Sequence, residues 1–152
     1  MKPGRKVLLI GFGNPGRLDD GLGPALIDEL EKKRIPDVSL DSNYQLNVED
    51  AEHISRFDTV IFADASINCL EPFEFKELNP SKDITFTSHS ISPQSVLALA
   101  QEMFSANTKG YIIEIRGYEF DSFGQEISPR AKDNLQKALE FISVKLSNQG
   151  FD

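Results

Sequence analysis

Residues 7–24 of this 152-residue chain read VLLIGFGNPGRLDDGLGP, and this stretch decides the fold. It begins with an apolar run, residues 7–10, that is typical of a buried strand. A glycine turn at residues 11–16 follows the strand, and two adjacent carboxylates, Asp19 and Asp20, follow the turn. A glycine turn after a first strand usually binds phosphate, whereas carboxylates at the start of a helix favour a cation. The function depends on which of these ligands the stretch binds.

Apolar runs and helix-period patterns alternate along the rest of the chain. We expect strands over residues 6–12, 38–42, 59–63, 72–78 and 111–117, and helices over residues 20–34, 49–55, 93–100 and 128–146. This alternation predicts an α/β fold, a three-layer sandwich in which a twisted, mostly parallel sheet of about five strands has helices on both faces. We expect residues 1–152 to form a single domain.

The composition excludes several classes of protein. The chain is 39% hydrophobic with 11 Phe, so it can bury a core, and 16 basic against 24 acidic residues give a net charge of −8. This acidic balance disfavours nucleic acid and anionic membranes as partners. No apolar run approaches the length of a membrane span. The single cysteine, Cys69, excludes an internal disulfide and a multi-cysteine zinc site, and we expect a cytoplasmic protein.

The glycine turn fits a nucleotide site only in part. The stretch from Gly11 to Gly16 satisfies the pattern G-x-G-x-x-G, and Asp41 after the second strand could bind a ribose, so a nucleotide-binding domain stays an alternative. However, Pro15 removes one N–H group from the turn, and Asp19 and Asp20 take the place of the phosphates. A carboxylate at about 4 Å from a phosphate charge costs roughly 4 kcal/mol at an effective dielectric near 20.

The two adjacent aspartates also have a simple structural interpretation. A carboxylate at a helix N-terminus stabilises the helix by roughly 0.3–1 kcal/mol, so both could be caps. One carboxylate is sufficient to cap a helix. A second carboxylate beside it, after a glycine turn, favours the binding of a cation. This stretch alone leaves capping and function open.

Asp64 and His89 are the other candidates for a functional site. Asp64 ends a buried strand, where a site residue and a turn aspartate are both common. His89 lies in a hydroxyl-rich stretch before a helix, whereas the other histidine, His53, belongs to a polar helix. Two carboxylates and an imidazole would make a three-ligand set for a borderline divalent metal. There is no G-x-S-x-G elbow, and we expect Cys69 to be a buried side chain.

Several motifs, taken in order, resemble those of the hydrogenase maturation endopeptidases, which trim the C-terminal tail of the large subunit of nickel–iron hydrogenases. The matching stretches are GxGN at residues 11–14, LDDGxG at residues 18–23, FADA at residues 62–65, SHSISP at residues 88–93 with VLAL at residues 96–99, and a weaker match at residues 120–129. Together they extend over nearly the whole chain. Two stretches depart from the family pattern. Pro15–Gly16 stands where members of the family more often carry aliphatic or polar residues, and residues 41–46 lack the usual glycine-rich turn.

The resemblance implies a five-stranded sheet between helices and a site of three residues. By their match to the family, Asp20, Asp64 and His89 are implied as metal ligands and catalytic residues. The nickel is implied to come with the substrate, a hydrogenase large-subunit precursor, so no tightly held metal of the chain's own is expected. The predicted chemistry is metal-assisted attack of water on the scissile amide.

The sequence therefore predicts a nickel-dependent endopeptidase that removes the C-terminal tail of a hydrogenase large-subunit precursor. A non-catalytic homologue that binds a metal-loaded partner protein is the first alternative, and a nucleotide-binding domain using the turn from Gly11 to Gly16 is the second.

Overall fold

The structure is a computed structural model that describes residues 6–80 and 91–148. The described elements, in chain order, are β1 (Val7–Phe12), η1 (Leu18–Gly21, a 3-10 turn), α1 (Leu22–Lys33), β2 (Val38–Asn43), α2 (Glu49–Ile54), β3 (Thr59–Ser66), β4 (Phe73–Leu78), α3 (Pro93–Phe104), β5 (Lys109–Arg116) and α4 (Pro129–Asn148). None of the helices in these ranges has the length and apolar character that crossing a membrane requires.

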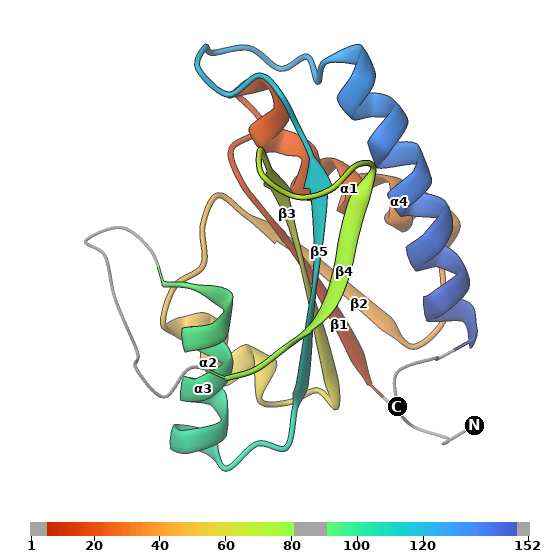
Figure 1. Cartoon of the computed structure of the whole chain (residues 1–152). Helices are drawn as coiled ribbons and strands as arrows, with labels where there is room; N and C mark the ends of the chain where they lie inside the picture. Colours follow the sequence, from red (N-terminus) through yellow and green to blue (C-terminus); the bar gives the residue numbers. More distant parts are fainter. Residues whose placement is uncertain (1–5, 81–90, 149–152) are drawn as a thin grey trace.

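The strands form one sheet in the order β2-β1-β3-β5-β4 (Figure 1). β1 pairs in parallel with β2 and β3, and β3 pairs in parallel with β5. Only β4, at one edge, runs antiparallel to its neighbour β5. The predicted α/β sandwich with a mostly parallel sheet is therefore confirmed.

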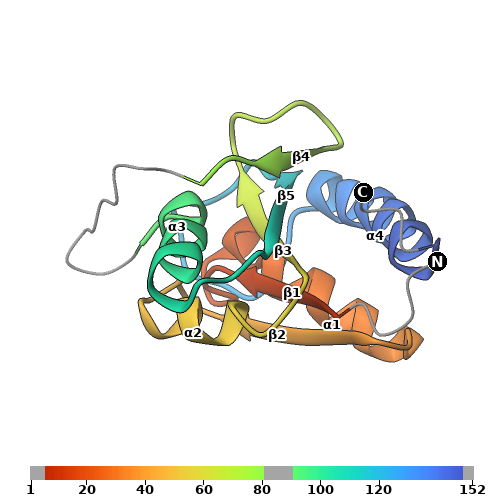
Figure 2. The same ribbon diagram turned by 90° about the horizontal axis from the view of Figure 1, so that it is seen from below.

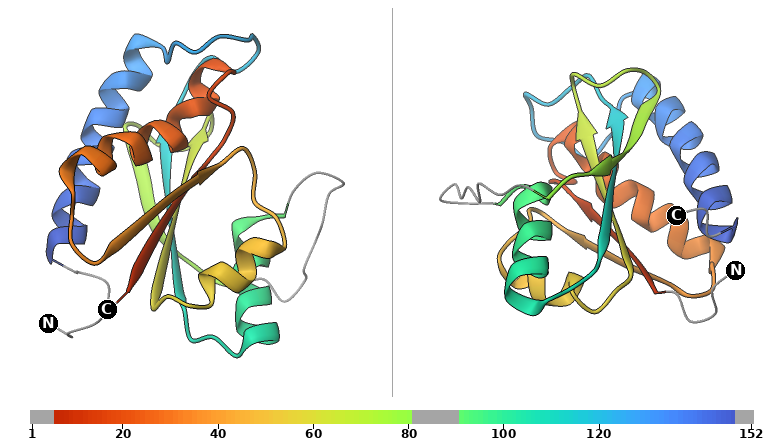
Figure 3. Two further views of the ribbon diagram at one scale, coloured as in Figure 1. Left: turned by 180° about the vertical axis from the view of Figure 1, so that it is seen from behind. Right: turned by 60° about the horizontal axis from the view of Figure 1, so that its bottom comes forward.

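Two hydrophobic cores lie on opposite faces of this sheet. Seen end-on, α1 and α4 cover one face and α2 and α3 cover the other (Figure 2), and the view from behind shows the same two layers (Figure 3). Along β1, Val7 and Leu9 join the core under α1 and α4, whereas Leu8 and Ile10 join the core under α2 and α3. Because both faces are buried, the strand reads as an unbroken apolar run rather than an alternating one.

The order of the strands creates a switch point between β1 and β3. The chain leaves β1 toward β2 on one side and returns to β3 on the other, so the connections diverge at the carboxyl ends of β1 and β3. Ligands of open α/β sheets bind at such a point. The pairing of β1 with β3 ends at Gly11–Ala63, whereas β3 continues beside β5 as far as Ser66. Asp64 therefore lies inside β3, just beyond the end of β1, and not in the turn after the strand.

The helix expected over residues 20–34 is interrupted near its start. The chain first makes the turn η1, and α1 begins only at Leu22. The reason is Pro24, which has no N–H to donate and whose ring would clash with the carbonyl four residues earlier, that of Asp20. Pro24 fits only in the first turn of a helix, and that condition fixes where α1 begins.

Candidate functional site

A cavity of about 420 Å³ opens at the switch point, at the carboxyl ends of β1 and β3. Its walls come from β1, η1, β3, the segment after β2 and the start of α3. The lining residues are Phe12, Gly13, Asp20, Tyr44, Gln45, Leu46, Asp64, Ile91, Ser92 and Pro93. The structure thus brings together two of the three predicted site residues, Asp20 and Asp64.

Asp20 is held by the glycine turn that precedes it. Its Oδ2 accepts a hydrogen bond of 2.8 Å from the backbone N–H of Asn14, and its own N–H donates to the carbonyl of Arg17. The approach is close because Gly13 has no side chain: a Cβ there would lie 2.1 Å from the carbonyl oxygen of Asp20. The glycine turn therefore fixes the position of the Asp20 carboxylate at the mouth of the cavity.

Asp64 is the carboxylate whose protonation the site changes most. Its pKa is raised to about 7, chiefly by burial and in smaller part by the negative charges of Asp20 and Glu114, against one hydrogen bond from the N–H of Ala65 at 2.9 Å. Such a carboxylate binds a proton readily and exchanges it for a cation, because an approaching positive charge favours the ionised form. The pair is therefore suited to a cation rather than to an anion.

His89 lies outside the described residues, so its place relative to Asp20 and Asp64 stays a prediction. Ile91 and Ser92, which follow it closely in the sequence, line the cavity. Over residues 6–80 and 91–148, no three His, Cys, Asp or Glu side chains are grouped in a way that could hold a metal ion. The described part of the cavity supplies two carboxylates, those of Asp20 and Asp64.

The N–H groups of the glycine turn are already bonded within the protein. The N–H of Gly13 donates to the carbonyl of Asn43, that of Asn14 to Asp20, that of Gly16 to Oδ1 of Asn14, and that of Arg17 to the carbonyl of Asn14. A pyrophosphate site needs such groups to point at the ligand. The nucleotide interpretation of this turn is therefore disfavoured.

The glycines of this stretch serve packing between β1 and α1. A Cβ on Gly11 would lie 2.4 Å from the carbonyl oxygen of Gly23, and a Cβ on Gly23 would lie 2.5 Å from that of Ala63. These two glycines therefore have a structural role, since the atoms that a Cβ would meet belong to the protein itself.

Asp19 is not a helix cap, contrary to the simpler interpretation of the sequence. Neither η1 nor α1 has a side-chain cap at its N-terminus. The Asp19 carboxylate instead turns away and accepts hydrogen bonds from Tyr118, Glu119 and Ser128. Burial alone raises the pKa of Asp19, but these hydrogen bonds outweigh burial and hold it below its usual value.

Glu114 is a charged neighbour that sequence reasoning missed. It is the register partner of Asp64 on β5, and its Oε1 lies 3.1 Å from Nζ of Lys76 on β4. The signal was a single acid within the apolar strand YIIEIR at residues 111–116. Cys69, in contrast, is buried as expected, and burial raises its pKa, which makes it a poor nucleophile.

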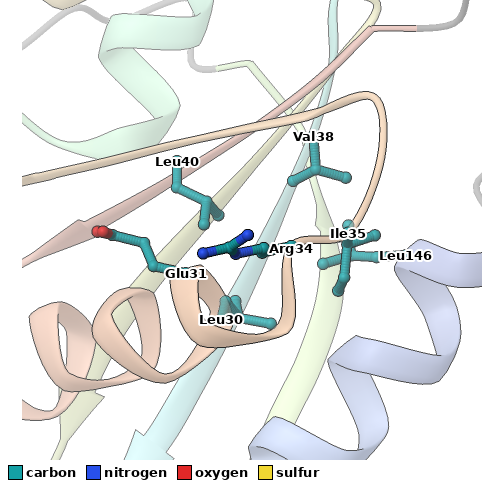
Figure 4. Close-up of a pocket in the computed structure, with 7 residues that line it drawn as sticks. All are labelled: Leu30, Glu31, Arg34, Ile35, Val38, Leu40 and Leu146. Atoms are coloured by element: carbon teal, nitrogen blue, oxygen red, sulfur yellow. The ribbon is translucent and has the colours of Figure 1, made fainter.

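A second hollow lies away from the acids, between the end of α1, β2 and α4 (Figure 4). It measures about 380 Å³, and its lining residues are Leu30, Glu31, Arg34, Ile35, Val38, Leu40 and Leu146. Most of these side chains are aliphatic and they lie toward the amino ends of the strands. The charged lining residues of this hollow are Glu31 and Arg34, so it lacks the paired carboxylates of the cavity at the switch point.

The chain is similar in sequence and in fold to known proteins. In sequence, the chain is similar to the hydrogenase expression/formation protein HupD of Thiocapsa roseopersicina, at 24% identity over 162 aligned residues that cover 99% of this chain and 72% of that protein. In structure, it is similar to the NiFe hydrogenase maturation protease HycI from Thermococcus kodakarensis, with a TM-score of 0.72 and 21% identity over 96% of this chain and 95% of that chain. The chain has the fold of the hydrogenase maturation proteases.

A further solved relative agrees with this assignment. The hydrogenase maturating endopeptidase HybD from E. coli superimposes with a TM-score of 0.71 and 19% identity, over 95% of this chain and 94% of that chain. No protein-family model matches the chain. The predicted resemblance to the hydrogenase maturation endopeptidases is confirmed by the relative in sequence and by the shared fold.

Proposed function

We propose that this protein is a nickel-dependent endopeptidase that removes the C-terminal tail of a nickel–iron hydrogenase large-subunit precursor, in the cytoplasm. The main support is that Asp20 and Asp64 line one cavity at the switch point of a chain with the fold of the hydrogenase maturation proteases. The names of the relatives support the same activity.

The nickel of this reaction belongs to the substrate. The precursor would present its metal to the cavity, where the carboxylates of Asp20 and Asp64, with the imidazole of His89, would take up open positions on it. Carboxylates and imidazole suit a borderline divalent ion such as nickel. An ion held there would polarise the scissile carbonyl and activate a water for attack on it.

The protein itself would position these ligands and would make cleavage depend on the presence of the metal. Because Asp64 exchanges its proton for a cation, the site is complete only when a metal-loaded precursor occupies it. Without a metal-loaded precursor, the raised pKa of Asp64 would favour its protonated form, which does not hold a cation. The enzyme would thereby test for nickel before the tail is removed.

The test is incubation of the purified protein with a nickel-loaded precursor, followed by mass spectrometry of the precursor. The expected result is loss of the C-terminal tail from the nickel-loaded form and an intact tail on the nickel-free form. If a related maturation protease removes the tail and this protein leaves it intact, the proposal is wrong. Stable capture of the precursor without cleavage would indicate the non-catalytic alternative.

A further inference from the structure

Asp19 is the most completely buried acid beside the site, with no exposed surface. Its Oδ1 accepts the backbone N–H of Ser128 at 2.7 Å, and its Oδ2 accepts the hydroxyl of Ser128 at 2.7 Å and the N–H groups of Tyr118 at 2.8 Å and Glu119 at 3.0 Å. No Lys, Arg or His of the described ranges forms an ion pair with it. A buried carboxylate is thus stabilised by hydrogen bonds alone.

These donors belong to one segment, residues 117–128, which joins β5 to α4. The segment passes beside the η1 turn at the carboxyl end of the sheet (Figure 1). It also bonds to the turn through the main chain: Leu18 donates to the carbonyl of Gly124 at 2.8 Å, Gly124 to that of Gly16 at 2.8 Å, and Asp19 to that of Glu119 at 3.0 Å. The turn is therefore held by a segment that does not line the cavity.

The turn needs this support because its backbone is strained. Leu18 has φ of 52°, in the left-handed region that a large side chain rarely adopts. Such a conformation costs of order 1–3 kcal/mol and persists only when its surroundings fix it. The strained residue lies two positions before Asp20, so its conformation determines where the Asp20 carboxylate points.

We propose that Asp19 is a positioning residue, which locks residues 117–128 onto the η1 turn and thereby directs the Asp20 carboxylate into the cavity. This inference rests on the proposed function. Burying a charge is more costly than burying a neutral acceptor, so stability alone is a weak reason for a carboxylate here. The ionised carboxylate of Asp19 can only accept hydrogen bonds, and here it accepts four. Together these four hydrogen bonds fix Asp19, the residue directly before Asp20.

The natural reporter of Asp20 is the backbone N–H of Asn14, which donates to the Asp20 carboxylate. Its exchange with solvent, followed by NMR, measures whether that carboxylate is in place without requiring any substrate. The second readout is the rate of tail removal from the nickel-loaded precursor, resolved into kcat and KM. It measures how much the position of the Asp20 carboxylate matters for the reaction.

The variants are D19N, S128A and S128T, with T108V as control. Thr108 is also buried, and its hydroxyl donates to the carbonyls of Ile54 and Phe57, on the opposite end of the sheet from the cavity. T108V therefore loses a buried hydroxyl of the same kind. S128A leaves the backbone N–H bonds to Asp19 intact, and so keeps the test open if D19N does not fold.

The expected result is at least tenfold faster exchange of the Asn14 N–H in D19N and S128A, with kcat lowered about 100-fold in D19N and about tenfold in S128A and KM within twofold. S128T should restore both, and T108V should change neither. The inference is overturned if Asn14 exchange and kcat are unchanged in both D19N and S128A, or if T108V changes them equally. A wild-type protein that does not cleave would refute the proposed function, while the Asn14 exchange would still decide the role of Asp19.

Discussion

The Oδ2 atom of Asp20 lies 2.8 Å from the backbone nitrogen of Asn14, so the proposed metal ligand is also an acceptor within the fold. Two variants, D20N and D20A, distinguish the role of Asp20 as a metal ligand from its role as a hydrogen-bond acceptor. D20N keeps an oxygen that can accept from Asn14 but loses the charge, whereas D20A loses both. We expect no tail removal by either variant, and a free energy of unfolding about 1–2 kcal/mol lower in D20A only. Chemical unfolding and the cleavage assay check this, and full activity in D20N would contradict the role of Asp20.

We expect the Asp64 carboxylate to lower the free energy of unfolding, although tail removal requires it. Its ionised carboxylate is buried near the charges of Asp20 and Glu114. D64N removes that charge and keeps an oxygen to accept the N–H of Ala65. We expect D64N to be inactive and, at neutral pH, at least as stable as the wild type in thermal unfolding, which is the exchange of stability for activity common at functional sites. A loss of stability above about 1 kcal/mol would show that the charge is compensated in the fold.

Features of this protein that depend on neighbouring residues could be predicted from the sequence. Features that depend on contacts between residues far apart in the chain could not. β1 was predicted almost to the residue, because strands buried on both faces read as apolar runs. The first residue of β3 was also predicted, but the strand continues past the expected end at residue 63 to Ser66. Asp20 and Asp64 were identifiable because both lie near the ends of such strands. The sequence left capping open as a role for Asp19, because the hydrogen-bond partners of its carboxylate stand 99 to 109 positions away in the chain. Local pattern cannot indicate a contact of that kind.

Asp50 gives a pH-dependent prediction away from the acidic pair. Burial raises its pKa, and the charges of Asp41 and Glu49 raise it further, against a hydrogen bond from the N–H of Asn47. A raised pKa means that the folded state binds the proton more tightly than the unfolded state, whose value is near 3.8. The contribution of Asp50 to stability is therefore full below that value and is lost as pH rises through the folded pKa.

The variant D50N cannot ionise but can still accept from Asn47. The melting temperature of D50N relative to the wild type should therefore be higher at pH 7 than at pH 3. Thermal unfolding of both proteins across this range, with T108V as a variant that removes no titrating group, measures the difference. A difference that stays constant with pH would mean that Asp50 has the same pKa in both states.

Two glycines of the turn should respond very differently to the same substitution. A Cβ on Gly13 would lie 2.1 Å from the carbonyl oxygen of Asp20, and its φ of 140° disfavours any side chain. A Cβ on Gly16 meets only the side-chain Oδ1 of Asn14, at 3.2 Å. We expect G13A to lose about 3 kcal/mol or more of unfolding free energy and to abolish tail removal, because the turn must move away from Asp20. G16A should stay within about 1 kcal/mol of the wild type and keep most of its activity, since the Asn14 side chain can shift slightly. Equal effects of the two variants would mean that the close approach of Gly13 to Asp20 does not set the geometry of the site.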